Sequence, residues 1–415
     1  MKPRSASVSA IPVDDYRDSI EQLLRPLAAR PAEVVALAQA LSRQLAEDVH
    51  SPIDLPVFRN SAMDGYAVRA ESVPVAPVTL PLSAVVAAGA TSARPLPHGA
   101  AMKVMTGAPL PLGADCVVPV EHTHADDTTV TFERRCRAGE FVREPGTDVR
   151  AGDLLVPAGT TVAPRHVAAL AAVGRSSVSV FGAIRAAVIT SGDELVPAGS
   201  VLRPGQIYDS NGLALAAALT ANGVDVVAVA HSTDDPVRFR TALAAATAAA
   251  DVVFTSGGVS MGDFEVVRNV LEPLGGHFGS VAMQPGGPQG LTVVDGVPVL
   301  SFPGNPVSTM VSFEVFARPI LRHLAGLPDV DSYELPLLTG LPRSPEGKRQ
   351  FLRGKMIFAQ EGDQPAVHRR ANAVELASGP GSHLIASMAR ADVLIDVPSE
   401  VTALPAGAHV RVWSL

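Results

Sequence analysis

The chain has 415 residues, of which 47% are hydrophobic and only 18% are charged. This balance is typical of folded globular proteins and excludes a largely disordered chain, and the length predicts about two to four domains. The formal net charge of −8, with no Lys/Arg cluster between aromatic residues, provides no basic surface for nucleic acid.

Cysteine usage and the N-terminus bear on the compartment. Cys116 and Cys136 are the only cysteines, which favours a reducing compartment over a disulfide framework and leaves one disulfide open. The N-terminal MKPRSASVSAIPVDDYRD has no apolar signal-peptide core, and no run of about 18 apolar residues occurs elsewhere. We therefore expect a cytoplasmic protein without a membrane span.

The N-terminal part is expected to be helical and then β-rich. Apolar residues recur at three- and four-residue spacing over 13–50, with Pro31 placed where a helix could begin. From 51 to 150 the pattern changes to short β-branched runs separated by Gly, Pro and Asp, which is typical of a small β domain. A helical pattern returns at 164–174.

Residues 184–329 form the clearest block, because strand-like and helix-like runs alternate there. The strands are expected at 185–190, 224–230, 251–256 and 297–302, and the helices at 212–223, 236–250 and 306–324. This alternation predicts an α/β domain with a parallel sheet and right-handed crossovers. Beyond it, β-type runs separated by glycines predict a small β domain at 330–415.

Each strand of the α/β block is followed by a turn of small residues. These turns are TSGDEL (190–195), TSGGVSMGD (255–263) and FPGNPVS (302–308). Ligands of parallel sheets bind outside the carboxyl ends of the strands, where these loops converge. The free N–H groups of Ser256-Gly257-Gly258 and Ser260 suit a phosphate or another oxyanion. The alternative is that the glycines only make tight turns.

The same loops carry carboxylates, which predict a divalent cation. Asp193, Glu194, Asp263 and Glu265 lie on two of them, and Asp234 and Asp235 lie on a fourth loop. Carboxylates beside an anion repel it unless a cation lies between them, and Mg²⁺ prefers oxygen ligands. We expect Glu194, Asp234 and Asp263 to hold it. Helix capping remains the alternative for Asp234-Asp235-Pro236.

Other catalytic signatures are absent from the sequence. There is no HExxH or paired CxxC motif for zinc and no Walker A loop. The loop at 105–121 presents Thr106 before two prolines, a rigid non-helical setting for a hydroxyl group that taken alone indicates only scaffold.

Five motifs, taken together and in order, resemble the MoeA family of molybdopterin molybdenumtransferases, which also includes the gephyrin E domain. They are NSAMDGYAV (60–68), MTGAPLPLGADCVVPVE (105–121), TSGDEL with GQIYDSNG (190–212), TSGGVSMGD (255–263) and SFPGNPVS (301–308). The resemblance extends over nearly the whole chain.

The resemblance implies an elongated homodimer of four-domain chains. Residues 13–50 and 151–183 would form a split helical domain I, 51–150 an inserted β domain II, 184–329 the molybdopterin-binding α/β domain III, and 330–415 the β domain IV. The cleft would lie between domains III and IV, with Asp64 reaching into it from domain II of the partner. The alternative for Asp64 is that it only stabilises its own turn.

The resemblance also implies site residues and chemistry. The catalytic residues would be Asp64, Asp148, Glu194, Asp234 and Glu265, and the substrate-binding residues Thr106, Ser256, Gly257, Gly258, Ser260, Gln284, Pro303, Gly304, Asn305, Pro306, Arg353 and Ser382. Adenylylated molybdopterin and molybdate would be the substrates and Mg²⁺ the cofactor. AMP would leave as molybdenum passes to the dithiolene sulfurs, and a molybdopterin adenylyltransferase would be a partner.

One segment departs from the pattern of the family. Where many relatives carry lysines, residues 283–290 read MQPGGPQG, so that Gln284 replaces a basic side chain. A common aspartate is also replaced by Glu265, which is one methylene longer. Loss of a charge-assisted contact to phosphate would weaken binding by about 1.5–3 kcal/mol unless other donors replace it.

A second hypothesis is a dimeric scaffold similar to the gephyrin E domain. In it, a groove between domains III and IV would bind a short peptide of a membrane receptor or a cell-division protein, with weak or no catalysis. The retained acids Asp64, Glu194 and Asp234 favour the enzyme, since a scaffold has no need for them.

Overall fold

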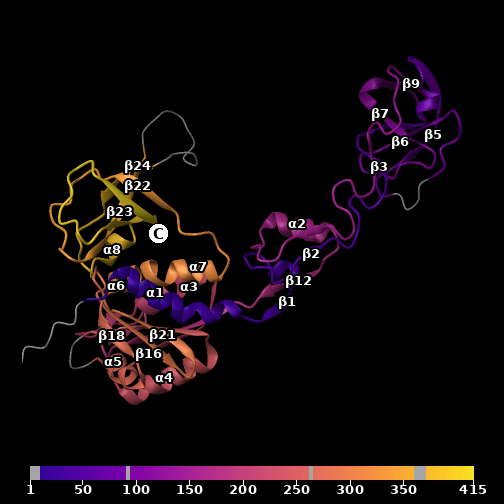
Figure 1. Ribbon diagram of the computed structural model, residues 1–415. Helices are drawn as coiled ribbons and strands as arrows, with labels where there is room; N and C mark the ends of the chain where they lie inside the picture. The colour runs from indigo at the N-terminus through magenta and orange to yellow at the C-terminus, as the bar shows by residue number, and fades with distance from the viewer. Residues whose placement is uncertain (1–9, 90–93, 261–264, 359–370) are drawn as a thin grey trace, which may run out of the picture. The chain divides into compact units, whose positions relative to one another are not determined.

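The computed structural model describes residues 10–89, 94–260, 265–358 and 371–415 (Figure 1). The chain divides into two compact units. Unit 1 comprises Met1–Glu33, Ser42–Gln44 and Phe181–Leu415, and unit 2 comprises Val34–Leu41 and Leu45–Val180.

Unit 1 contains a six-stranded sheet with the strand order β16-β13-β17-β21-β20-β18. Its parallel strands confirm the four expected from the sequence: β16 (Val224–Ser232), β13 (Ile184–Ser191), β17 (Val252–Ser256) and β21 (Val297–Phe302). Two antiparallel strands, β20 (Pro288–Val294) and β18 (His277–Ser280), extend it, so the sheet is mixed rather than purely parallel. The β20–β21 turn has positive φ at Asp295 and Gly296, the Asp-Gly signal of a hairpin.

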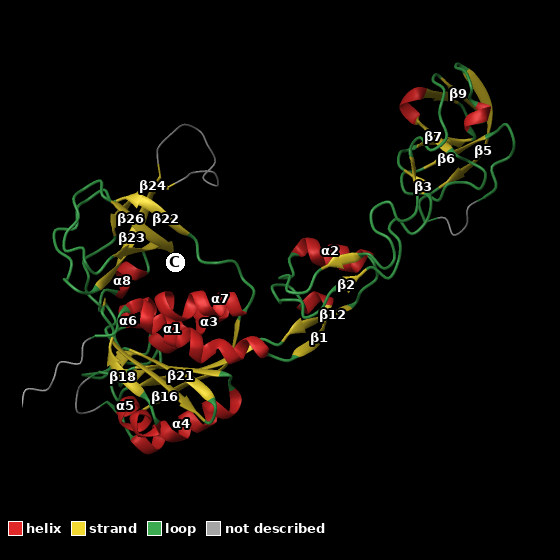
Figure 2. Ribbon diagram, in the orientation of Figure 1, coloured by secondary structure: helices red, strands yellow, loops and turns green. Residues whose placement is uncertain are grey.

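Helices cover both faces of this sheet (Figure 2). One face packs against α1 (Val13–Leu24), α3 (Asn211–Ala221), α6 (Pro306–Ser312), a π-helical turn (Phe313–Ala317) and α7 (Arg318–Leu324), and the other against α4 (Pro236–Ala249) and α5 (Val266–Leu271). Residues of β13 alternate between the layers, as a pleated strand requires: Ala186 and Val188 face the first, Ala187 and Ile189 the second. Among the described helices, none combines the length and the apolar composition needed to cross a membrane.

The C-terminal part of unit 1 forms a second sheet, as the sequence predicts. Its order is β19-β23-β25-β26-β22, with β24 paired to β23. The elements are β19 (Met283–Gln284), β22 (Ser332–Pro336), β23 (Arg349–Phe358), β24 (Ala371–Leu376), β25 (Val393–Val397), β26 (His409–Ser414) and the short helix α8 (Ile385–Met388). Because β19 follows β18 directly and pairs with β23, it ties this sheet to the α/β part.

Unit 2 is built mainly of strands, as expected for 51–150. A six-stranded sheet has the order β7-β4-β6-β5-β9-β8, and three short pairs accompany it. The strands of the sheet are β4 (Gly65–Val68), β5 (Val78–Val86), β6 (Ala101–Val104), β7 (Cys116–Pro119), β8 (Thr123–Ala125) and β9 (Thr129–Phe132); the pairs are β1 (Ala32–Ala36) with β12 (Ser177–Phe181), β2 (Val49–His50) with β11 (Leu154–Val156), and β3 (Asn60–Ser61) with β10 (Val142–Arg143). Helix α2 (Pro164–Ala172) confirms the helix predicted at 164–174.

The prediction of a helix in the second half of 13–50 is wrong. Residues 32–36 form strand β1, only a 3₁₀ turn follows at Leu37–Gln39, and the chain reaches β2 without another helix. Val34 and Val35 are β-branched and favour a strand. Pairing with β12, far along the sequence, satisfies the backbone of this segment, and no local periodicity reveals such a partner.

Helix α1 confirms the first half of that prediction but packs elsewhere than expected. Tyr16, Ile20 and Leu24 share a core with the π-helical turn, and the rings of Tyr16 and Phe316 lie 5.0 Å apart. The residues that share a core with 156–180 begin only at Leu37, apart from half-buried Val35. The boundaries of the four domains stay a prediction.

Candidate active site

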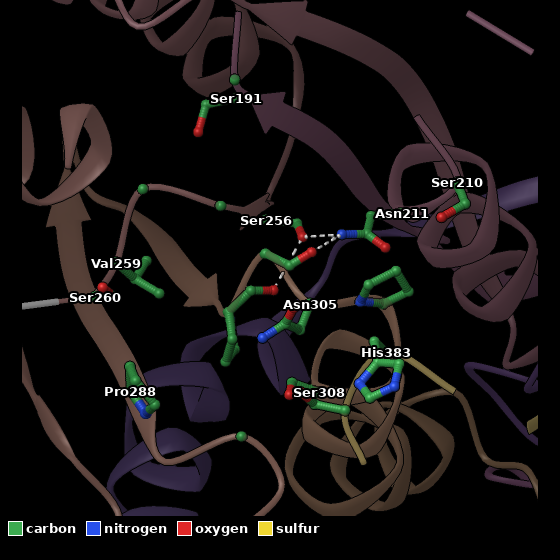
Figure 3. Close-up of a pocket in the computed structure, with 18 of the residues that line it drawn as sticks. Ser191, Ser210, Asn211, Ser256, Val259, Ser260, Pro288, Asn305, Ser308 and His383 are labelled. Carbon is green, nitrogen blue, oxygen red and sulfur yellow. Dashed lines mark hydrogen bonds between the residues drawn. The ribbon is translucent and has the colours of Figure 1, made fainter. Parts of the chain in front are cut away.

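A cavity of about 800 Å³ lies in unit 1, where the carboxyl ends of the parallel strands face a loop of the C-terminal sheet (Figure 3). The loops after β13, β17 and β21 all contribute to it, as expected for a parallel α/β arrangement. Most of the residues predicted to form a site line it: Glu194, Asp234, Ser256, Gly257, Gly258, Ser260, Glu265, Gln284, Pro303, Gly304, Asn305, Pro306 and Ser382.

Asn211, which sequence reasoning missed, joins two of these loops. Its Nδ2 donates to Ser256 Oγ at 2.9 Å and to the Gly304 carbonyl at 2.8 Å (Figure 3). The residue is buried at the first position of α3. It therefore fixes the loop after β17 against the loop after β21. The signal was its place in GQIYDSNG, directly before a helical run.

Ser256 is held from a second side by Thr309 of α6. Their hydroxyl oxygens lie 3.1 Å apart, and Thr309 Oγ1 donates to the Pro303 carbonyl at 2.6 Å. All of these atoms are buried. The predicted substrate loop at 303–306 is thus rigidly bonded to the end of β17, and Ser256 acts here as a structural link.

The glycines after β17 are required by close backbone approach. Gly257 has a φ of +100°, and a Cβ built on it would lie 2.7 Å from the carbonyl oxygen of Ser191. Gly258 has a φ of +64°, and its Cβ would meet the Val267 nitrogen at 2.9 Å. Any side chain would therefore push this loop away from the end of β13 and from α5.

The carboxylates of the cavity interact with one another. Desolvation raises the pKa of Asp234, a hydrogen bond from the backbone N–H of Asp193 lowers it, and the charges of Asp193, Glu194 and Glu265 raise it again. The backbone N–H of Asp234 in turn donates to Asp193 Oδ1 at 3.1 Å. Such mutual repulsion is typical of a site that binds a cation.

The predicted metal ligands are only partly placed together. Glu194 and Asp234 both line the cavity, whereas Asp263 lies outside the described residues. Within the described ranges, no group of three or more His, Cys, Asp or Glu side chains is close enough to hold a metal ion. A metal ion would thus have at most two described ligands of these four residue types.

Asp209 is a further carboxylate on the cavity wall that the sequence did not single out. Its Oδ2 accepts from Thr190 Oγ1 at 2.6 Å, and its Oδ1 accepts from the Gly212 N–H at 3.0 Å. Both oxygens are therefore engaged at the start of α3. This geometry assigns Asp209 to positioning Asn211 and its helix.

The loop before α8 closes the cavity from the C-terminal sheet. Ser382 and His383 line the cavity, and the Ser382 carbonyl accepts from the Val307 N–H at 3.2 Å. That bond joins the loop to the first turn of α6. His383 is the residue of this wall that sequence reasoning missed, although it directly follows Ser382 in the GSH motif.

Arg353 lies behind this loop and does not line the cavity. It is completely buried on β23, and its guanidinium donates to the Ser378 hydroxyl at 3.0 Å and to the Gly381 carbonyl at 3.2 Å. The hydroxyl of Ser387 and the carbonyl of Gly379 accept further bonds. Burial lowers the pKa of Arg353. In the structure Arg353 supports the loop, and its predicted role as a substrate contact stays a prediction.

The remaining predicted residues belong to unit 2. Thr106 donates to Asp64 Oδ1 twice, from its N–H at 2.6 Å and from Oγ1 at 2.8 Å. These two bonds hold the pKa of the exposed Asp64 below its ordinary value. Asp148 is exposed, and its backbone N–H bonds to Leu55. The structure thus makes Asp64 and Thr106 direct neighbours, and their predicted roles in the site stay predictions.

Comparison with known proteins gives matches along the chain. Residues 11–174 match the family model described as "MoeA N-terminal region (domain I and II)", residues 187–323 "Probable molybdopterin binding domain", and residues 336–415 "MoeA C-terminal region (domain IV)".

Individual proteins are similar over nearly the full length. The "Molybdopterin molybdenumtransferase 2" of Mycobacterium tuberculosis is 40% identical over 97% of this chain and 99% of its own length. The "Molybdopterin molybdenumtransferase" of Haemophilus influenzae is 32% identical over 95% of each chain. A solved structure, a molybdopterin biosynthesis MoeA protein from Pyrococcus horikosii, superimposes with a TM-score of 0.80 at 31% identity, covering 98% of this chain and 99% of that one.

Proposed function

The chain belongs to the MoeA family, and from that premise we propose that it is a molybdopterin molybdenumtransferase of molybdenum cofactor biosynthesis. The reaction joins molybdate-derived molybdenum to adenylylated molybdopterin and releases AMP. The observation that carries this assignment is the cavity itself, in which the matched loops of the α/β sheet and of the C-terminal sheet meet.

Both substrates are anionic and adenylylated molybdopterin is large, and the cavity is suited to them in size and in backbone donors. Its volume of about 800 Å³ lies within the ~300–1,000 Å³ typical of small-molecule sites. The loops at 256–260 and 303–306 bind the phosphate groups through N–H groups, and Asn211 fixes the distance between these loops.

Molybdate binds beside Ser382, within the field of Arg353. The guanidinium accounts for this choice, because its hydrogen-bond partners are hydroxyl and carbonyl oxygens rather than a carboxylate. Arg353 Nη1 is buried with no hydrogen-bond partner among the described residues. A buried cation that lacks a counter-ion favours an anion nearby.

A Mg²⁺ ion fits the donor set as a cofactor held by Glu194 and Asp234. Mg²⁺ commonly takes one or two protein carboxylates and completes its shell with water and phosphate oxygens, so a cage of three acids is not required. When bound, the ion supplies positive charge to the phosphoanhydride. The protein orients the substrate and excludes water from it.

A homodimer completes the proposal. Asp64 reaches the cavity of the partner subunit, where its carboxylate contacts the substrates, and Thr106 holds it in one orientation. Asp148 and Glu265 complete the acidic set. A molybdopterin adenylyltransferase would supply the adenylylated substrate. The scaffold hypothesis gains no support from the comparisons, since the similar curated proteins described above carry the names of transferases.

The test is AMP release by the purified protein supplied with adenylylated molybdopterin, molybdate and Mg²⁺. We expect release that depends on molybdate and is reduced in Asp234→Asn. Asp235→Asn is the matched control, because Asp235 caps α4 through a bond from the Val237 N–H and lies off the cavity wall, and Asn caps helices equally well. Absence of AMP release, or release that is indifferent to molybdate, would refute the proposal.

A further inference from the structure

The cavity has an unusual charge balance for a site of anionic substrates. Its described lining includes the carboxylates Glu194, Asp209, Asp234 and Glu265, and no lysine or arginine. His383 is the one basic residue type on the described wall. Neutral hydrogen-bond donors must therefore meet the substrate oxygens at many points.

Gln284 is the neutral side chain best placed for this. It is half-buried on β19 and lines the cavity. Its carbonyl Oε1 is occupied, because it accepts from Gln350 Nε2 at 2.7 Å. No acceptor among the described residues bonds to Gln284 Nε2, so both of its N–H groups remain to be donated.

Gln350 is the partner of Gln284 in this arrangement and lies in the core. It lies opposite Gln284 in the β19–β23 pair and is 2% exposed. Its own Oε1 is buried without a partner among the described residues, an arrangement that lowers stability. A residue that only strengthened the fold would gain nothing from such an amide, since an apolar side chain fills the same space without it.

The carboxylates select the same direction for the amide of Gln284. With its N–H groups toward the cavity, the positive end of the amide dipole lies in a cavity whose wall carries four carboxylates. The reversed amide would turn its carbonyl oxygen toward those acids and toward any oxyanion. The bond from Gln350 and the charge of the cavity wall therefore both favour the orientation in which Gln284 presents N–H donors to the cavity.

We infer that Gln350 is a positioning residue that holds Gln284 as an N–H donor to an oxyanion of the substrate. This inference rests on the proposed function, which supplies two sources of that chemistry, molybdate and the phosphate of the nucleotide. A neutral donor in place of a cation makes the contact insensitive to salt and dependent on orientation.

Calorimetric titration of the whole protein with AMP and, separately, with molybdate tests the inference. Gln350→Met keeps the volume and removes the donor, so that the affinity for one of the two anions should fall about three- to tenfold. Gln350→Glu should reduce it more at about pH 7.5, because a carboxylate only accepts and forces Gln284 to reverse. Adenosine, which has no phosphate, should bind all variants alike.

A pH series separates positioning from general damage to the fold. A buried carboxyl group has a raised pKa and in its protonated form donates again to Gln284. Relative to the unaltered protein at each pH, Gln350→Glu should regain affinity at about pH 5.5, whereas Gln350→Met should not. Gln284→Met should lose the affinity for the same anion at both pH values.

The outcomes are distinct. Loss of affinity in both Gln350 variants with acid rescue only in Gln350→Glu supports the inference, and the anion affected identifies its source. Should the unaltered protein bind AMP or molybdate while the variants bind them equally well, the inference fails and the proposed function stands. Should the unaltered protein bind neither anion, both fall.

Discussion

Replacement of Gly257 by alanine tests the close approach of two loops at the cavity. Gly257 has a φ of +100°, and its Cβ would stand 2.7 Å from the Ser191 carbonyl oxygen and 3.0 Å from Ser191 Oγ. Gly275 is a matched control in the same unit, because its φ is +90° and no atom lies within 4 Å of the Cβ position. The two substitutions therefore share a positive φ and differ in the contact.

The difference between the variants follows from these distances. An alanine at positive φ costs about 1–3 kcal/mol of unfolding free energy in either position, and the smaller entropy of its unfolded chain offsets both equally. Gly257→Ala adds a clash with main-chain atoms, which overpacking data place at roughly 1–3 kcal/mol. We therefore expect Gly257→Ala to be the less stable variant by about that amount.

Guanidinium unfolding followed by tryptophan fluorescence measures this difference. Trp413 is the single tryptophan of the chain and packs in unit 1 with its ring 5.8 Å from that of Phe351. AMP titration gives the second measurement, in which Gly257→Ala should bind weakly and Gly275→Ala normally. Equal unfolding free energies for the two variants would refute the argument from close contact.

Three further predictions concern charged groups. The pKa of Asp234 is raised by desolvation and then by its acidic neighbours. The metal-free protein therefore loses stability as pH rises through that pKa. Asp234→Asn should raise the melting temperature at neutral pH in EDTA, and this gain should vanish below about pH 4. The pKa of Asp64 is lowered by Thr106. The stability that the Asp64 carboxylate contributes is therefore present above the ordinary pKa and is lost as pH falls through the lowered pKa. A carboxyl NMR titration of Thr106→Val should show an Asp64 pKa that is partly restored, since the bond from the backbone of residue 106 remains. Arg353→Lys should lower the free energy of unfolding by about 2–4 kcal/mol, measured with guanidinium, because one ammonium cannot donate to the Gly379 and Gly381 carbonyls, as Arg353 Nη2 does, and also replace the bond from Nε to Ser387 Oγ.

The parts of the fold that the sequence predicted are those determined by local pattern. β13, β17 and β21 are apolar runs followed at once by small residues, and both signals lie within one window of sequence. The parallel arrangement then brings their loops together, since the carboxyl ends of parallel strands share one edge. This is why Glu194, Ser256 and Asn305 were placed in one site without a structure.

The errors concern residues whose state depends on distant partners. Residues 32–36 carry an apolar pattern compatible with a helix, and β12 overrides it by pairing. The role of Arg353 in the site stays a prediction, and only the packing of β23 beneath the loop at 378–381 shows that its side chain is buried. Gln350 could not be identified from the sequence, because its inferred role depends on its hydrogen bond to Gln284.

The charged groups of unit 1 come from segments that lie far apart in the sequence. The acids Glu194 and Asp234 come from loops of the α/β sheet, whereas the buried cation Arg353 comes from the C-terminal sheet. The α/β part alone would present carboxylates to an anionic substrate and repel it. The C-terminal sheet therefore adds a positive charge behind the cavity wall, and β19 holds the two sheets in contact because it follows an α/β strand in sequence and pairs with β23.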